Sequence, residues 1–377
     1  MINRIKRLLA LSMALLLLTG CWDKIEINEL AFVIALGIDM EEDGLYTVTC
    51  VIPNLPVYTG KEGGAQDEAK YTKTASAATI TGAYKELTTR LNKELNFEHM
   101  EALVLGDSLF HDTDKLKQLA NHVDRNAQYS KKIPVLAAKG KAADVLEAPT
   151  TDANAVGQYI SGIYENNASS IIRHFEVSLQ EFISKMNGEE INFLLPMVLL
   201  EEEEISIENA MVLKDGRNSG IMELKDMERY SWLRNFTTGL EYPLSLSHGV
   251  VSMEIEESKC KYGYSMDAEG RLTISLSIAA YAKIGEYAFD RGDDLAEESI
   301  RNEIEMLASE QIKSDVLTML AAMQTVYQAD ICGLNEDMKF QNKKLYLETQ
   351  DIWQDVFLNA NFAVDAEVTV RRIGITK

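Results

Sequence analysis

Cysteine, histidine and proline are scarce in this sequence, and each scarcity excludes a class of protein. Four cysteines spread over 377 residues are too few and too far apart for a small disulfide-stabilised domain. The five histidines show neither the HxxxH nor the HExxH spacing, so no zinc site can be identified. The six prolines form no proline-rich segment, and we find neither an internal repeat nor a low-complexity region.

The motifs of common catalytic and nucleotide-binding sites are also missing. There is no G-x-S-x-G nucleophile elbow, and no P-loop or Rossmann glycine pattern follows a predicted strand. The acidic run at 201–204 lacks the glycine-turned loop of a cation site and is typical of a solvated segment. Catalytic groups can converge in space without a sequence motif, but nothing here supports an enzyme. We therefore predict no catalytic residue, no metal site and no cofactor.

The charge balance is strongly acidic. The formal net charge is −22 at pH 7, and the first 20 residues contribute only basic side chains to it. Such a chain is not attracted to nucleic acid, and anionic lipid headgroups repel it. We therefore predict no nucleic-acid partner and expect membrane affinity to require an anchor.

The first 21 residues have the pattern of an export signal. A segment with three basic residues precedes an apolar run over 8–18, which is shorter than the roughly 20 residues of a membrane-spanning helix. Leu18-Thr19-Gly20-Cys21 follows and resembles the lipobox of bacterial lipoproteins, in which the cysteine thiol receives a diacylglyceryl group and becomes the first mature residue. We predict a signal peptide over 1–20 and lipidation at Cys21. The alternative is an ordinary secretory signal with an incidental cysteine.

Only a short segment separates this anchor from the folded body. The continuous apolar block 30–38 predicts a buried strand, which leaves residues 22–29 as the tether. At about 3.3 Å per residue this tether reaches at most about 26 Å. We therefore expect the body to lie close to the bilayer.

Hydrophobic periodicity predicts alternating strands and helices in the first half of the chain. Strands are expected over 45–52, 102–105, 133–138 and 191–200, and helices over 80–95, 113–127, 142–147 and 179–186. Asp112 or Thr113 is expected to cap one helix, and Ser178 with Glu181 forms a capping box for another. Because Pro196 has no amide hydrogen, the strand over 191–200 should be an edge strand or be broken there.

The acidic run at 201–204 is the predicted domain boundary, because four like charges repel and favour solvent. Beyond it we expect two strands over 205–213 and 221–224, a helix over 226–236, an antiparallel meander, a long helix from Asp293 to about Met323, and a last strand over 362–370.

These elements predict a multidomain α+β or α/β protein. We expect a signal peptide at 1–20, anchor and tether at 21–29, and an N-terminal mixed-sheet α/β domain at 30–200. A small middle α/β unit at 201–249 and a C-terminal domain at 250–377, an antiparallel sheet packed with a long helix, should follow. Cys50, Cys260 and Cys332 are expected to be small buried side chains, and a Cys260–Cys332 pair remains open.

Several segments together resemble the Ger(x)C family, the lipoprotein C subunits of germinant receptors in endospore-forming bacteria. They are Cys21-Trp22-Asp23-Lys24-Ile25-Glu26-Ile27-Asn28-Glu29-Leu30, Gly37-Ile38-Asp39, residues 98–106, Ala329-Asp330-Ile331-Cys332-Gly333, Trp353 with Phe357, and residues 370–374. The sequence departs from the family pattern at Cys332-Gly333-Leu334-Asn335, where a second apolar residue and often a second glycine are expected.

The resemblance implies a lipid-anchored, non-enzymatic accessory subunit of a nutrient germinant receptor. Such a subunit docks with integral membrane subunits of the A and B types on the outer face of the inner spore membrane, and Cys21 is its implied site residue. A solute-binding lipoprotein and an exported cell-wall hydrolase are the alternatives. The short tether and the lack of two similar lobes disfavour the first, and no motif supports the second.

Overall fold

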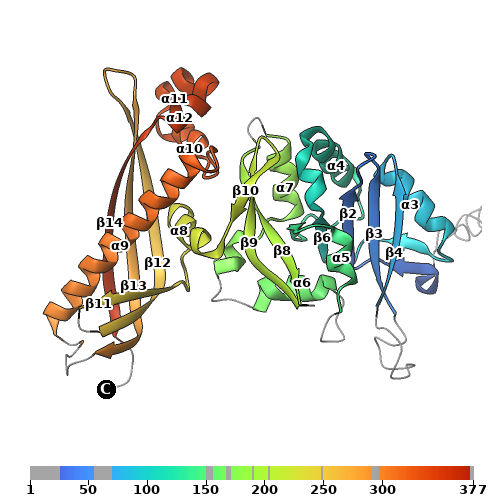
Figure 1. Cartoon of the computed structure of the whole chain (residues 1–377), viewed down its shortest axis with the longest axis horizontal. Helices are drawn as coiled ribbons and strands as arrows, with labels where there is room; N and C mark the ends of the chain where they lie inside the picture. The colour runs from blue at the N-terminus through green and yellow to red at the C-terminus, as the bar shows by residue number, and fades with distance from the viewer. Residues whose placement is uncertain are drawn as a thin grey trace, which may run out of the picture.

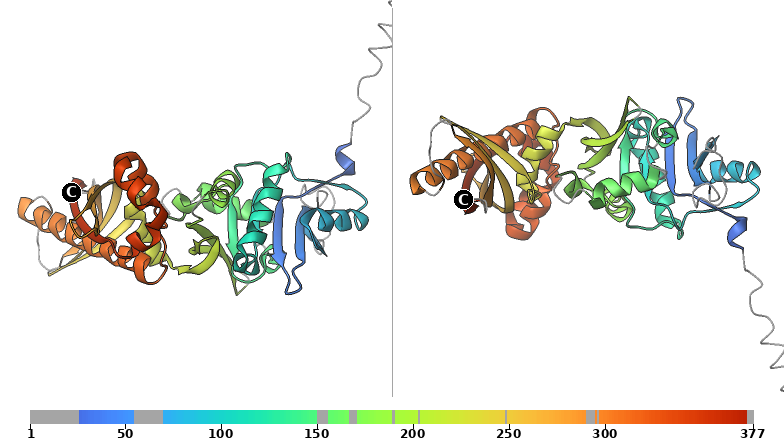
Figure 2. Two further views of the ribbon diagram at one scale, coloured as in Figure 1. Left: turned by 90° about the horizontal axis from the view of Figure 1, so that it is seen from above. Right: turned by 90° about the horizontal axis from the view of Figure 1, so that it is seen from below.

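The chain folds around two β-sheets that follow one another along the long axis of the molecule (Figure 1). A computed structural model describes residues 26–54, 70–149, 156–166, 171–188, 191–202, 204–247, 249–289, 295 and 297–373. The first described residues and the long helix of the second half lie at opposite ends of the molecule (Figure 2).

The first half contains an eight-stranded mixed sheet in the order β10-β9-β8-β7-β6-β2-β3-β4. Its strands are β2 (Ala35–Met40), β3 (Tyr46–Pro53), β4 (Lys70–Ala77), β6 (Ala102–Leu105), β7 (Val135–Ala138), β8 (Phe193–Glu201), β9 (Glu204–Lys214) and β10 (Arg217–Met222). The four central strands β2, β6, β7 and β8 are parallel, and the two outer strands on each side pair antiparallel. A separate parallel pair joins β1 (Leu30–Phe32) to β5 (Glu94–Asn96).

Helices cover both faces of this sheet. The helices of this half are η1 (Ile27–Glu29), α3 (Ile80–Thr89), η2 (Asp107–His111), α4 (Thr113–Arg125), α5 (Ala142–Glu147), α6 (Val156–Asn166), η3 (Ile171–Phe175) and α7 (Leu179–Met186), of which η1 has no buried residue. Side chains of α3, α4 and α7 belong to one buried apolar cluster and those of α5 and α6 to another. Both predicted caps are confirmed: Asp112 accepts hydrogen bonds from the first turn of α4, and Ser178 and Glu181 form the capping box of α7.

The second half contains a four-stranded sheet in the order β11-β12-β13-β14. Its elements are α8 (Leu224–Arg234), β11 (Glu241–Leu246), β12 (Gly249–Met266), β13 (Leu272–Phe289), α9 (Glu298–Thr325), α10 (Leu334–Gln341), α11 (Lys343–Thr349), η4 (Gln350–Ile352), α12 (Trp353–Leu358) and β14 (Asn361–Ile373). The long helix α9 crosses one face of the sheet (Figure 1). The alternation of buried and exposed residues in β11 shows that the other face meets solvent.

Helix α9 also covers the edge of the second sheet. The edge strand β14 donates two backbone hydrogen bonds to α9 side chains, from Val368 N to Ser309 Oγ (3.0 Å) and from Val370 N to Glu305 Oε1 (2.7 Å). Two amides of an edge strand are thereby paired, which protects the edge against pairing with another chain.

The predicted fold class is confirmed: a mixed sheet with helices precedes a second sheet packed against a long helix. The last strand, however, runs parallel to β13, so the second sheet is not purely antiparallel. The apolar run 30–38 is not one strand, because β1 and β2 belong to different sheets. Leu95 lies in β5 and not on the preceding helix.

The predicted domain boundary at 201–204 stays a prediction, and the structure places a hairpin of the first sheet there. Glu201 pairs with Glu204 at the hairpin between β8 and β9, so the first sheet continues to Met222. The expected middle unit is therefore divided between the two sheets, and one apolar cluster runs without interruption from the first sheet through α8 into the second. The described glutamates of this run, Glu201, Glu202 and Glu204, are exposed, as predicted, and they lie at a turn between two strands.

Pro196 lies inside the sheet, contrary to the prediction of an edge or a broken strand. β8 pairs with β9 along its whole length, but its register with β7 begins only at Met197. Pro196 therefore lies one residue before the segment of β8 that pairs with β7. Its missing amide hydrogen removes no backbone hydrogen bond to β7.

Candidate functional site

The predicted lipidation site, Cys21, lies outside the described residues, as does Trp22. The described chain begins just before η1, where the side chain of Ile27 is 73% exposed. Within the part of the chain that is described, no helix is both long and apolar enough to cross a membrane.

The Gly37-Ile38-Asp39 segment lies in β2, where its last residue contacts the start of α5. The Asp39 carboxylate is 1% exposed and accepts hydrogen bonds from Ala142 N to Oδ1 (2.7 Å) and from Ala143 N to Oδ2 (3.1 Å). A side chain at Gly106 is excluded, because its Cβ would lie 1.9 Å from Asp39 Oδ1. Asp39 therefore caps α5 from a strand about 100 residues earlier in the chain.

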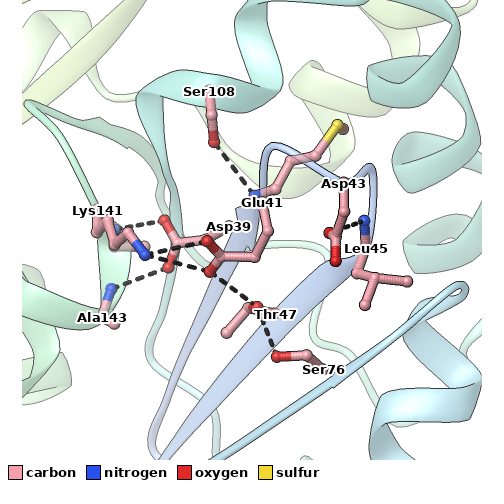
Figure 3. Close-up of polar contacts among 11 residues, drawn as sticks. Asp39, Glu41, Asp43, Leu45, Thr47, Ser76, Ser108, Lys141 and Ala143 are labelled. Carbon is pink, nitrogen blue, oxygen red and sulfur yellow. Dashed lines mark hydrogen bonds and ion pairs between the residues drawn. The ribbon is translucent and has the colours of Figure 1, made fainter.

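A chain of polar contacts surrounds Asp39 (Figure 3). Lys141 Nζ forms an ion pair with Glu41 Oε2 (3.1 Å), and Thr47 Oγ1 donates to Glu41 Oε1 (3.0 Å) while contacting Ser76 Oγ (2.8 Å). Burial raises the pKa of the Asp39 carboxyl above its usual range, and the two backbone amides and Lys141 oppose that rise. All of these groups are satisfied by protein partners, so the cluster fixes α5 to the sheet and offers no open ligand site.

His99 and Glu101 of the 98–106 segment lie at the start of β6. The His99 ring packs edge-on against Phe32, with 5.3 Å between ring centroids, as expected of a structural histidine. Burial raises the pKa of Glu101, and a hydrogen bond from Gln158 opposes this. No group of His, Cys, Asp or Glu side chains with metal-binding geometry occurs among the described residues.

The later segments of the family pattern come together around Asp330, which is 3% exposed. Its carboxylate accepts hydrogen bonds from Cys332 N (3.2 Å), Asn335 N (3.0 Å) and Trp353 Nε1 (3.2 Å). Trp353 in turn packs against Phe357, with 6.0 Å between ring centroids. Gly333 has φ of +71°, a left-handed conformation that favours glycine, at the start of α10. Asp330 therefore organises the turn before α10 and holds α12 to it.

The three cysteines that the structure describes are buried and free. Burial raises the pKa of the Cys50 thiol to about 12 and that of Cys260 to about 11. These thiols are therefore protonated at neutral pH, and the possible Cys260–Cys332 disulfide is absent.

A cleft of about 530 Å³ lies at the junction of the two halves, and it is the strongest candidate binding site. One wall comes from the first half, through η3, α7 and the start of β8, and the other from the end of α8, the 330–333 turn and α10. Tyr230 and Arg234 of α8 fix the turn, donating to the carbonyl oxygens of Ile331 (2.9 Å) and Cys332 (2.5 Å). Figure 1 shows α7, α8 and α10 at this junction.

Three basic side chains line the cleft: Lys185, Arg234 and Lys339. The Lys185 ammonium, at the end of α7, lies 5.5 Å from the centroid of the Phe193 ring, and the Arg234 guanidinium lies 5.9 Å from that of Phe236. Burial lowers the pKa of Lys185, and the positive charge of Arg234 lowers it further, while Glu181 and Glu336 oppose the shift. Among the described residues, no carboxylate lies within ion-pair distance of the Lys185 ammonium or of the Arg234 guanidinium.

Sequence reasoning missed this cleft because its lining residues extend from His174 to Tyr346 along the chain. No local motif marks them. The one available signal was Asp330-Ile331-Cys332-Gly333, which the family resemblance included and which forms part of one wall.

Two family models match the chain in tandem. One describes a spore germination protein N-terminal domain and matches residues 23–200, and the other describes a spore germination B3/GerAC-like C-terminal domain and matches residues 208–374.

Individual relatives agree with these matches. Spore germination protein B3 of Bacillus subtilis (strain 168) is 21% identical over 370 residues, which cover 96% of both chains. Spore germination protein A3 of the same organism is 23% identical over 71% of this chain and 74% of that protein. The crystal structure of the GerBC protein has the same fold, with a TM-score of 0.57 and 19% identity over 92% of this chain and 100% of that one.

Proposed function

Since this chain belongs to the GerAC/GerBC-like C-subunit family of spore germination proteins, we propose that it is a lipid-anchored, non-enzymatic subunit of a nutrient germinant receptor. Its role would be to dock with the integral membrane subunits of that receptor on the outer face of the membrane. The family is not known for enzymes, which agrees with the lack of catalytic motifs in the sequence.

The observation that carries the proposal is the position of the family match relative to the lipobox. The first matched residue is Asp23, two positions after Cys21, and the two matches then reach residue 374. A lipobox cysteine followed directly by the matched chain supports a mature protein that begins at a diacylated Cys21. Two acyl chains, at about 0.8 kcal/mol per buried CH₂, are sufficient for stable anchoring.

Docking close to the bilayer is supported by the short distance between Cys21 and the fold. Residues 22–29 can span at most about 26 Å even when fully extended, and Ile27 exposes most of its apolar side chain there. An apolar side chain so close to an anchor is suited to contact with headgroups or with a membrane subunit.

Replacing the anchor residue tests the proposal. In Cys21→Ala, metabolically incorporated labelled fatty acid should be lost from the protein, the chain should leave the membrane fraction, and the germination response to nutrients should fall. Cys50→Ala is the matched control, because it removes a buried thiol and leaves the lipobox intact. Label that persists in Cys21→Ala would refute the anchor.

Crosslinking tests the docking role separately. A photoreactive side chain at Ile27 should crosslink to integral membrane subunits in intact membranes, whereas one at Ser277, on the solvent face of the second sheet, should not. Equal crosslinking from both positions, or from neither, would contradict docking through the N-terminal segment.

A further inference from the structure

We propose that the cleft between the two halves binds a small organic carboxylate, whose anionic group lies between Lys185 and Arg234 and whose apolar part lies against the aromatic side chains of the walls. This ligand site is distinct from membrane docking, and the proposal does not depend on the function proposed above.

The charge arrangement is the first reason. Lys185 and Arg234 extend from different helices into one cleft, and neither has a carboxylate partner within ion-pair distance among the described residues. The Arg234 guanidinium donates to a neutral carbonyl oxygen, at Cys332, and the Asp330 carboxylate favours its charged form without forming an ion pair. In a chain with a net charge of −22, it is unusual that a half-buried Lys185 and an exposed Arg234 in one cleft both lack an ion-pair partner among the described residues. A desolvated charge such as that of Lys185 is costly unless it is paired, and an anion between Lys185 and Arg234 would supply the pair.

The electrostatics of Lys185 agree with this geometry. Burial is the largest cause of its lowered pKa, and the charge of Arg234 is the next. The free cleft therefore disfavours the ammonium form. A bound carboxylate would favour that form and accept hydrogen bonds from the ammonium and from the planar guanidinium fork.

The rest of the cleft restricts the chemistry of the ligand. The carboxylates of Glu176, Glu181, Asp330 and Glu336 also line it, so a ligand with several negative charges would be repelled, whereas a single carboxylate reaches the cations at lower cost. Phe236, stacked on His174 at 5.8 Å between centroids, supplies an aromatic surface. A volume of about 530 Å³ is typical of sites for small molecules, not for folded partners.

The position of the cleft gives the ligand a further effect. Lys185 belongs to the first half of the chain, whereas Arg234 is bonded to the 330–333 turn of the second half. A carboxylate held by both cations would therefore connect the two walls and oppose their separation. Amide hydrogen exchange in the 330–341 segment should slow when the ligand is bound.

The test uses the full-length chain in detergent micelles, with benzoate as the probe and calorimetric titration as the measurement. Benzoate should bind saturably, and Lys185→Gln and Arg234→Gln should each weaken binding at least tenfold. Lys117→Gln is the matched control, because it removes one positive charge from the exposed face of α4 and should leave affinity unchanged. Inorganic phosphate should bind more weakly than benzoate.

A folding control separates loss of a ligand contact from loss of structure. The Lys185 side chain makes no hydrogen bond or ion pair with any described residue, so Lys185→Gln should melt no lower than the unchanged protein when no probe is present. Lack of saturable benzoate binding up to about 10 mM, equal binding by Lys185→Gln, or tighter binding of phosphate would each overturn the proposal. Membrane fractionation and germination measurements on Cys21→Ala would be unaffected by that outcome, so the two proposals can fail separately.

Discussion

The two sheets of this protein bury their apolar side chains in different ways. In the first sheet, every residue of β6 and β7 is buried, because helices cover both faces. In the second sheet, β11 alternates strictly between exposed and buried residues, because α9 covers only one face. The comparison teaches that the first sheet depends on many short helices, whereas the second depends on one long helix for both its face and its edge.

The largest expected effect on the free energy of unfolding comes from placing a charge on a covered face of either sheet. Lysine at Leu103 or at Val104, neighbours on opposite faces of β6, should unfold the protein, because each places a charge in an apolar core at a cost above about 4 kcal/mol. In β13, Leu276→Lys should be equally damaging, but Ser277→Lys should change the free energy of unfolding by less than about 0.5 kcal/mol. Urea unfolding followed by circular dichroism measures all four. A tolerated Val104→Lys would show that the second face of β6 is not sealed.

The next effect compares the buried carboxylates of the two halves. Asp330→Ala leaves three N–H donors without their acceptor and should cost about 4 kcal/mol, whereas Asp39→Ala leaves two and should cost about 2 kcal/mol. Urea unfolding gives both values. The reverse order would show that capping α5 matters more than joining α10 to α12.

A pH series sharpens that comparison through Asp39→Asn, which cannot titrate. The folded-state pKa of Asp39 is raised, so the folded chain binds this proton more tightly than the unfolded chain does. The stability that protonated Asp39 contributes is therefore complete below about pH 4 and declines as the pH rises through the folded pKa. The destabilisation caused by Asp39→Asn should consequently be smaller at pH 7 than near pH 4. An increase with pH would contradict the direction of the shift.

The smallest effect concerns the protected edge. The pair of changes Ser309→Ala and Glu305→Ala should remove the two acceptors for β14 at a cost of about 1 kcal/mol each and should promote self-association. Sedimentation velocity measures the association. Thr318→Ala, an exposed position on the same helix, is the control and should leave the protein unassociated.

Elements specified by local sequence were predictable, and those specified by distant partners were not. The helix over 142–147 and the caps at Asp112 and Ser178 follow from periodicity and capping residues within a few positions of one another. The direction of β14 and the separation of β1 from β2 depend on strands far away in the chain, which a local pattern does not encode.

Short-range reasoning also failed for the site. In the sequence, Lys185 is an ordinary basic residue in the last turn of a predicted helix. Arg234 occupies the same kind of position in a second helix. Only the fold shows that these two helix ends face the same cleft. Cys21 is the reverse case, since its predicted role follows wholly from four adjacent residues and not from any tertiary contact.

The hairpin at 201–204 has a practical consequence for work with fragments. The two family models meet near it, so residue 200 is an obvious place to divide the gene, yet the division would fall inside a sheet. An N-terminal fragment ending there would lose β9 and β10, and the apolar strand β8 would become an unpaired edge. A row of free amides and carbonyls on such a strand is a template for aggregation. Soluble expression of the first half therefore calls for a C-terminal end beyond Met222, after the sheet is complete.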